Sequence, residues 1–230
     1  MKKKYGRRNF INTAIAGGIG LGLSNSFSAL YAQSGASQKR IGIIGLDTSH
    51  SIAFTKALNA AGASADFKGY KAVAAYPKGS NDIISSAERI PGYTEEVKKL
   101  GVEIVSSIKE LLKKTDYILL ETNDGRLHLQ QALEVIKAGK PMFIDKPIAA
   151  SLKDAVAIFK AAEQNKVPVF SSSSLRFMTS AQEVAKGKVG KVLGADCYSP
   201  AHLEKTHPDL FWYAIHGVET LYTVMGTGCK

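Results

Sequence analysis

Short apolar runs alternate with helical patterns along most of this chain, and this alternation restricts the fold more than any other feature. Six runs suit strands that are buried on both faces: residues 41–46, 72–76, 102–105, 117–120, 142–144 and 167–170. Strands that alternate with helical segments indicate parallel βαβ units, whose right-handed crossovers leave few topologies. The sequence therefore predicts an α/β fold with a Rossmann-type doubly wound parallel sheet.

Several helix ends are marked by particular residues. A helical pattern covers residues 52–61, and Ser107 with Glu110 resembles a capping box that opens another helix. Gly139 stands where a glycine commonly ends a helix, and Ser151 precedes a further helical pattern. These signals separate the strands into individual βα units.

The loops that follow the strands are the places where we expect chemistry. In a doubly wound sheet, ligands bind outside the carboxyl ends of the strands. The corresponding residues are 47–50, 76–80, 121–124, 145–147 and 171–176.

The turn after the first strand is a degenerate dinucleotide fingerprint. Of the three glycines in G-x-G-x-x-G, only Gly45 is present; Asp47 and His50 take the places of the other two. Thr48 and Ser49 offer hydroxyls, and the following helix offers backbone amides at its N-terminus. We predict that Gly45, Thr48, Ser49 and His50 contact a cofactor; a capped helix start without a ligand is the alternative.

The second strand ends at Tyr76, where NAD-binding sheets commonly carry an Asp or Glu for the ribose 2′-hydroxyl. Lys78 follows, and a cation at this place can accept the 2′-phosphate of NADP. A solvated surface loop is the alternative. The predicted cofactor is therefore NAD or NADP, with Lys78 as a candidate contact.

A more specific signal lies between Ala138 and Ala149, around Asp145-Lys146-Pro147. This stretch resembles a motif of the Gfo/Idh/MocA oxidoreductases, and the resemblance extends over roughly residues 39–226. It implies a dinucleotide-binding domain over residues 41–172. Further cofactor contacts are predicted at Thr122, Asn123, His128, Asp145 and Arg176.

The resemblance gives Lys146 a catalytic role. It implies that Lys146 lies beside the nicotinamide and hydrogen-bonds the substrate hydroxyl that loses its proton. An ammonium group there lowers the pKa of the hydroxyl and stabilises a developing alkoxide. We expect the Lys146 side chain to point into the cofactor cleft rather than the core; a surface lysine that opens a loop is the alternative.

A second catalytic element resembles the D-x-x-x-H-x-x-D helix of the same family. His216 fills the histidine position, Glu219 the last acidic position, and Trp212 stands where the first Asp would be. Glu219 shares a helix face with His216 and is predicted to orient its imidazole. Trp212 and Tyr213 are candidates for an aromatic platform under a sugar ring. A purely structural His216 is the alternative.

Residues 1–32 have the order of a secretory signal: a basic start, an apolar Gly-rich stretch from Phe10 to Leu23, and a small polar region. Arg7 and Arg8 resemble a twin-arginine signature, with a general secretory signal as the alternative. The stretch is too short and too rich in glycine for a stable membrane anchor. We therefore expect export to the periplasm, with residues 33–40 as a linker.

Composition excludes some partners. The net charge is +10, but five positive charges lie within the first eight residues, which leaves +5 for the remainder. No basic run recurs later, so a nucleic-acid partner is not expected. Cys197 and Cys229 have no metal-ligand spacing, and no metal is predicted from them.

Residues 173–230 match only the start of the family's α+β second domain, so we expect a truncated second domain. Residues 191–198 are predicted as its first strand and residues 214–225 as its helix. The leading functional hypothesis is a homo-oligomeric NAD(P)-dependent oxidoreductase of a small sugar or polyol, in which Lys146 and His216 handle the proton.

Two other functions stay open. One is cleavage of a glycosidic bond through transient oxidation by a tightly held NAD. The other is a non-catalytic sugar-binding protein on a decayed Rossmann frame, which the departures at Asp47, Tyr76 and Trp212 favour.

Overall fold

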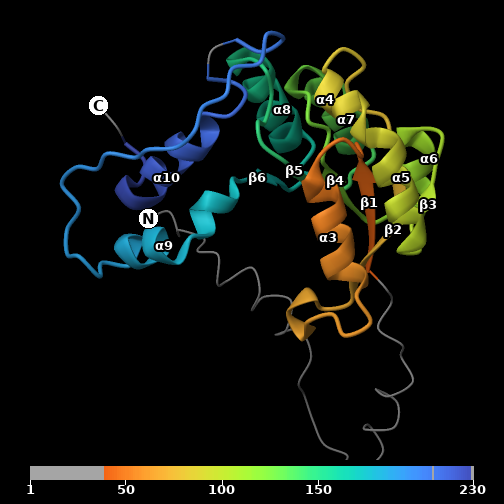
Figure 1. Cartoon of the computed structure of the whole chain (residues 1–230), viewed down its shortest axis with the longest axis horizontal. Coiled ribbons are helices and arrows are strands. Elements are labelled where there is room, and N and C mark those ends of the chain that lie inside the picture. Colours follow the sequence, from red (N-terminus) through yellow and green to blue (C-terminus); the bar gives the residue numbers. More distant parts are fainter. Residues whose placement is uncertain (1–38, 209, 229–230) are drawn as a thin grey trace, which may run out of the picture. The chain divides into compact units, whose positions relative to one another are not determined.

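The computed structural model describes residues 39–208 and 210–228. Its centre is a six-stranded sheet in the order β3-β2-β1-β4-β5-β6, with every neighbouring pair parallel (Figure 1). The strands are β1 (Lys39–Ile44), β2 (Tyr70–Tyr76), β3 (Glu103–Ile104), β4 (Tyr117–Leu120), β5 (Met142–Ile144) and β6 (Val169–Ser171). This order confirms the predicted Rossmann topology.

Helices cover both faces of the sheet. One face packs against α6 (Ile108–Lys114), α7 (Gly125–Lys137) and α8 (Leu152–Gln164). The other packs against α3 (Ser49–Asn59) and α5 (Arg89–Lys99), and short α4 (Ile84–Ala87) precedes α5. Each face therefore has its own apolar core, and the strand ends form an edge between the two layers.

The predicted helix signals are largely confirmed. Ser107 caps α6 by accepting from the Glu110 amide at 3.2 Å, but the Glu110 carboxylate accepts from the amide and hydroxyl of Ser106 instead of Ser107. Half of the capping box is thus displaced by one residue. Gly139 follows α7 with a φ of +68°, and Ser151 caps α8.

Element boundaries differ from the prediction by a few residues. Helix α3 begins at Ser49 rather than residue 52, because the Thr48 hydroxyl caps it. Strand β6 begins at Val169, after Pro168, which has no N–H to donate to a ladder. Lys39 and Arg40 belong to β1, so the predicted linker 33–40 ends earlier. Residues 1–32 lie outside the described residues.

A helical segment follows the sheet. It contains η2 (Ser174–Phe177), α9 (Thr179–Ala185) and α10 (Ile215–Met225), and α10 packs against both α9 and η2 (Figure 1). Helix α10 confirms the predicted helix, but the strand predicted at residues 191–198 is not formed. A strand needs a hydrogen-bonded neighbour, and none of the described strands pairs with this segment.

No helix among the described residues is both long enough and apolar enough to cross a membrane.

Candidate active site

The turn after β1 presses against the end of β4. Gly45 has a φ of +89°, and a Cβ atom there would lie 2.5 Å from the Thr122 backbone, so only glycine fits this crossing. Thr48 caps α3 by accepting from two backbone amides of the first helical turn. Ser49 is exposed. Gly45 and Thr48 thus build the turn, and two of the amides predicted to face a phosphate already have a partner.

Asp47 turns inward from the same loop. Its carboxylate is fully buried and accepts from the backbone amides of Asn123 at 3.0 Å and Ser80 at 3.4 Å. Gly79 makes room for it, since a Cβ there would lie 2.1 Å from Asp47 Oδ2. Burial raises the pKa of Asp47 to about 6. Asp47 therefore connects the loops after β1, β2 and β4. Its carboxylate points inward, away from the place where the second glycine of the fingerprint would let a pyrophosphate approach.

A cavity of about 220 Å³ lies between the loop after β2 and the helices α6 and α7. Tyr76 and Lys78 line it on one side, and Gln131 and Glu134 of α7 on the other. The Oε1 atom of Gln131 is buried and has no hydrogen-bond partner in the part of the chain that the structure describes. Lys78 and this acceptor thus belong to the lining of one cavity.

The loop after β4 begins with a residue that the sequence analysis placed at a strand end but did not single out as a site residue. Glu121 is fully buried, and neither carboxylate oxygen has a hydrogen-bond partner among residues 39–208 and 210–228. Burial is the main cause that raises its pKa well above the ordinary value, and Asp145 adds to the rise. A carboxylate directly after the apolar strand β4 was the only available signal, because its burial depends on the neighbouring loops.

Two of the predicted residues after β4, Asn123 and His128, serve the scaffold. Both ring nitrogens of His128 face backbone carbonyls, Nε2 that of Thr122 at 2.6 Å and Nδ1 that of Ile148 at 3.2 Å. Asn123 donates from Nδ2 to the Ser86 hydroxyl at 3.0 Å. Burial lowers the pKa of His128. A neutral ring donates to one of these carbonyls only, but both nitrogens point at the loops after β4 and β5, so neither points toward a cofactor.

Asp145 and Lys146 follow β5 at the same edge. Asp145 Oδ2 lies 2.8 Å from His50 Nδ1, so His50, from the start of α3, faces Asp145. Lys146 is buried, with only 8% of its surface exposed. Its Nζ lies 5.6 Å from the centre of the Tyr213 ring. The sequence analysis expected the Lys146 side chain to point into the cofactor cleft rather than the core. In the structure the side chain is enclosed, and Tyr213 from the segment after β6 covers its ammonium group.

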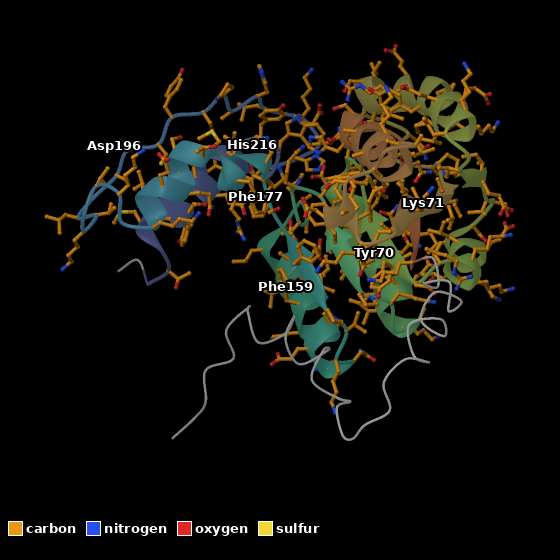
Figure 2. All side chains as sticks on the ribbon, turned by 90° about the horizontal axis from the view of Figure 1, so that it is seen from below. Tyr70, Lys71, Phe159, Phe177, Asp196 and His216 are labelled. Atoms are coloured by element: carbon orange, nitrogen blue, oxygen red, sulfur yellow. The ribbon has the colours of Figure 1, made fainter. Side chains whose placement is uncertain are left out.

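His216 belongs to α10, which packs against η2; Figure 2 labels His216 and also Phe177 of η2. Its Nδ1 lies 2.6 Å from the hydroxyl of buried Ser173, and its ring centre lies 4.9 Å from that of Tyr213. Burial lowers the pKa of His216, and the charge of Lys146 lowers it further. When Nδ1 of the neutral imidazole donates to the Ser173 hydroxyl, Nε2 carries no proton and can act as an acceptor.

Glu219 does not orient His216 as predicted. Its carboxylate accepts from the backbone amide of Ser173 and pairs with the guanidinium of Arg176. The cation and the amide from the loop after β6 attract the carboxylate more strongly than a neutral imidazole on its own helix. Ser173 therefore takes the orienting role, and Arg176 faces α10 rather than serving as a free cofactor contact.

Of the predicted aromatic platform, only Tyr213 lines the site. Trp212 packs on His207, with ring centres 4.7 Å apart. His207 is buried, and its Nε2 accepts from the Gly125 amide at 3.1 Å, which anchors the segment after α9 to the start of α7. No local pattern marks His207, because its partner lies 82 residues away.

The dinucleotide implied by the sequence fits the residues present. Two buried polar atoms have no hydrogen-bond partner among the described residues: Thr122 Oγ1, after β4, and Gln131 Oε1, on α7. Thr122 lies at the edge where such sheets bind dinucleotides, and the cavity lined by Lys78 and Gln131 follows the end of β2. Gly45 keeps the first glycine of the fingerprint, although the inward Asp47 replaces the second.

Comparison with known proteins agrees with this reading. The family model described as "Oxidoreductase family, NAD-binding Rossmann fold" (GFO_IDH_MocA) matches residues 15–173. A 1,5-anhydro-D-fructose reductase from Ensifer adhaerens is 31% identical over 52% of this chain and 38% of its own length. An uncharacterized oxidoreductase from Streptococcus pneumoniae is 26% identical over 51% of this chain and 33% of its own. The chain thus spans less than half the length of these curated relatives.

Solved structures share the fold. An NAD-binding protein from Listeria innocua has a TM-score of 0.58 at 19% identity, over 80% of this chain and 54% of its own. The WlbA dehydrogenase from Bordetella pertussis, in complex with NADH and UDP-GlcNAcA, has a TM-score of 0.51 at 23% identity, over 66% and 40%. Together with the family match over residues 15–173, these findings show that the chain belongs to the Gfo/Idh/MocA oxidoreductase family with its NAD-binding Rossmann fold.

Proposed function

We propose that this chain forms the cofactor-binding part and the proton-handling centre of an NAD(P)-dependent oxidoreductase that acts on a sugar or polyol. The observation that carries this proposal is the convergence of Lys146 and His216 on the Tyr213 ring, at 5.6 Å and 4.9 Å from its centre. They come from β5 and α10 and meet at the carboxyl edge of the sheet. The similarity to a 1,5-anhydro-D-fructose reductase supports a sugar-related substrate.

The chain's own residues divide the proton chemistry. NAD(P), when bound, supplies the hydride acceptor or donor. The Lys146 ammonium donates to the substrate oxygen and stabilises the negative charge that develops on it. In the tautomer whose Nδ1 donates to the Ser173 hydroxyl, His216 accepts the proton at Nε2, and the lowered pKa favours the neutral ring. Tyr213 excludes water on the side of the site that it covers.

The Arg7-Arg8 signature carries a further part of the proposal, namely export to the periplasm by the twin-arginine route in a folded state. Fractionation of cells that express the chain tests this part. Replacement of both arginines by lysine should retain the protein in the cytoplasm. Unchanged export would contradict a twin-arginine route. We also propose that the working protein is a homo-oligomer, which light scattering of the purified protein measures.

The test of the redox function begins with binding. We expect the purified chain to bind NADH or NADPH saturably, as followed by nicotinamide fluorescence in the presence of EDTA. Turnover is then measured as nicotinamide reduction over a panel of sugars and polyols. Lys146→Met should lower turnover at least ~100-fold, the lower range for loss of a positioned proton-transfer group, and should change cofactor affinity much less.

Lys153→Met is the matched control, because Lys153 is exposed on α8. It should leave both quantities unchanged. Absence of saturable binding of either nucleotide would overturn the proposal and favour a non-catalytic protein. Release of aglycone from aryl glycosides without net change in nicotinamide absorbance would instead favour cleavage through transient oxidation.

A further inference from the structure

Three potential metal ligands meet where β1, β4 and β5 end. His50, Glu121 and Asp145 each offer one ligand atom, and these atoms lie within 4.8 Å of one another. Glu121 and Asp145 are buried, and Asp145 Oδ2 lies 2.8 Å from His50 Nδ1. Metal ligands at about 2.0–2.2 Å from one ion lie about 3–4 Å apart, so a small side-chain adjustment converts this cluster into a coordination shell.

The carboxylate of Glu121 is the independent sign that something belongs in the cluster. It has no exposed surface, and both of its oxygens lack any hydrogen-bond partner among the described residues. Buried polar groups in folded proteins are almost always paired, and an unpaired carboxylate is among the most costly exceptions. By contrast, buried Asp47 has two amide donors and Asp145 has His50.

The balance of buried charges around Glu121 also favours a cation. Three buried carboxylates, Asp47, Glu121 and Asp145, influence this region, and Lys146 is the buried cation that faces Glu121. His216 is largely neutral because burial and Lys146 lower its pKa. The region therefore carries an excess of negative charge whenever the carboxylates are ionised.

We propose that His50, Glu121 and Asp145 bind a divalent first-row transition-metal ion. One imidazole nitrogen and two carboxylate oxygens suit Mn²⁺, Fe²⁺ or Zn²⁺, whereas Mg²⁺ and Ca²⁺ prefer oxygen ligands alone. The side chain of His50 is 38% exposed, so the imidazole forms the side of the cluster through which an ion enters from solvent. Three protein ligands leave coordination positions open, as in catalytic rather than structural sites.

The ion would lie near Lys146, which follows Asp145 in the chain. Any action of the ion on the substrate oxygen rests on the proposed redox function. Binding itself does not depend on that function. The test therefore measures binding alone, with no nicotinamide and no substrate present.

The experiment uses the whole chain without a histidine tag, freed of metal by EDTA and transferred to a chelator-free buffer at pH 7.5. Mn²⁺ is added, and the free ion is measured by its electron paramagnetic resonance signal, with Zn²⁺ as the competitor. We expect one saturable Mn²⁺ site per chain, which Zn²⁺ displaces. Glu121→Gln and His50→Gln should each weaken Mn²⁺ binding at least ~100-fold, since loss of a direct ligand exceeds the effect of losing an outer partner.

Controls separate this site from others. His202→Gln removes an exposed imidazole outside the cluster, and Glu163→Gln removes an exposed carboxylate on α8; both should bind Mn²⁺ like the unmodified chain. Circular dichroism and thermal unfolding verify that Glu121→Gln remains folded. Mn²⁺ should raise the unfolding temperature of the unmodified chain but not that of Glu121→Gln.

The proposal is overturned if neither Mn²⁺ nor Zn²⁺ binds saturably, or if Glu121→Gln and His50→Gln bind Mn²⁺ as tightly as the unmodified chain. The redox function is tested separately, because nicotinamide binding is measured in EDTA. Failure of the chain to bind a metal ion therefore does not imply failure to bind a nicotinamide cofactor, and the reverse also holds.

Discussion

Asp47→Asn offers a quantitative test of how the first turn is built. Asp47 is fully buried, and burial raises its pKa from the ordinary 3.8 to about 6. The unfolded chain therefore releases this proton at a lower pH than the folded chain. Between about pH 4 and 6 the folded state binds more protons, so the stabilising contribution is complete below 3.8 and is lost as the pH rises through 6. A difference of about two pH units corresponds to about 3 kcal/mol.

Asparagine at position 47 cannot ionise, so the variant lacks this contribution to the pH dependence. Urea unfolding of both chains at pH 4 and pH 7 measures it, with fluorescence of Trp212, the single tryptophan, as the probe. Other ionisable groups are present in both chains and largely cancel. Between pH 4 and pH 7 the difference in unfolding free energy should move by about 2.5 kcal/mol in favour of the variant, because part of the contribution is already lost at pH 4.

The control is Asp66→Asn, because Asp66 is exposed. Its unfolding free energy relative to the unmodified chain should be nearly independent of pH. A difference between Asp47→Asn and the unmodified chain that stays constant within about 0.5 kcal/mol would refute the argument that Asp47 is held inward at a raised pKa.

Other changes test the remaining parts of the site. Gly45→Ala should destabilise the chain by about 2–5 kcal/mol in urea unfolding, from backbone strain and a 2.5 Å clash, whereas Gly139→Ala, with a φ of +68° and open space, should cost only about 1 kcal/mol. Ser173→Ala should lower turnover about 10-fold and shift its pH profile, because it removes the 2.6 Å partner of His216; an unchanged profile contradicts an orienting role. His207→Phe should cost about 1–3 kcal/mol, because it leaves a buried backbone amide unpaired, and a smaller loss measured by Trp fluorescence contradicts the anchor.

The sheet was predictable because its signals are local. Each strand is a short apolar run, and each helix begins or ends at a residue such as Ser151 or Gly139 whose effect extends over only a few positions. Right-handed crossovers then determine the order of the strands without any long-range contact being known. The strand predicted at residues 191–198 is not formed. A strand needs a hydrogen-bonded neighbour, and a local apolar pattern does not reveal whether such a neighbour is present.

The site was only partly predictable, because its side chains are oriented by distant segments. Lys146 and His216 were identified from motifs, and the structure brings both to Tyr213. The direction of Asp47 is set by amides 33 and 76 residues further along the chain, and the partner of Glu219 is set by a loop from another element. No spacing rule within one helix or turn contains that information.

The carboxylates at the strand ends differ in what compensates each of them, and this difference decides their roles. Asp47 accepts from two backbone amides, so its surroundings are complete without any ligand. Asp145 faces His50, which is half-exposed and free to exchange partners. Glu121 has no hydrogen-bond partner in the described part of the chain, so its burial is favourable only if it is protonated or if a cation or donor binds it. Addition of a divalent ion should therefore act directly on Glu121, whereas Asp47 keeps its two amide donors.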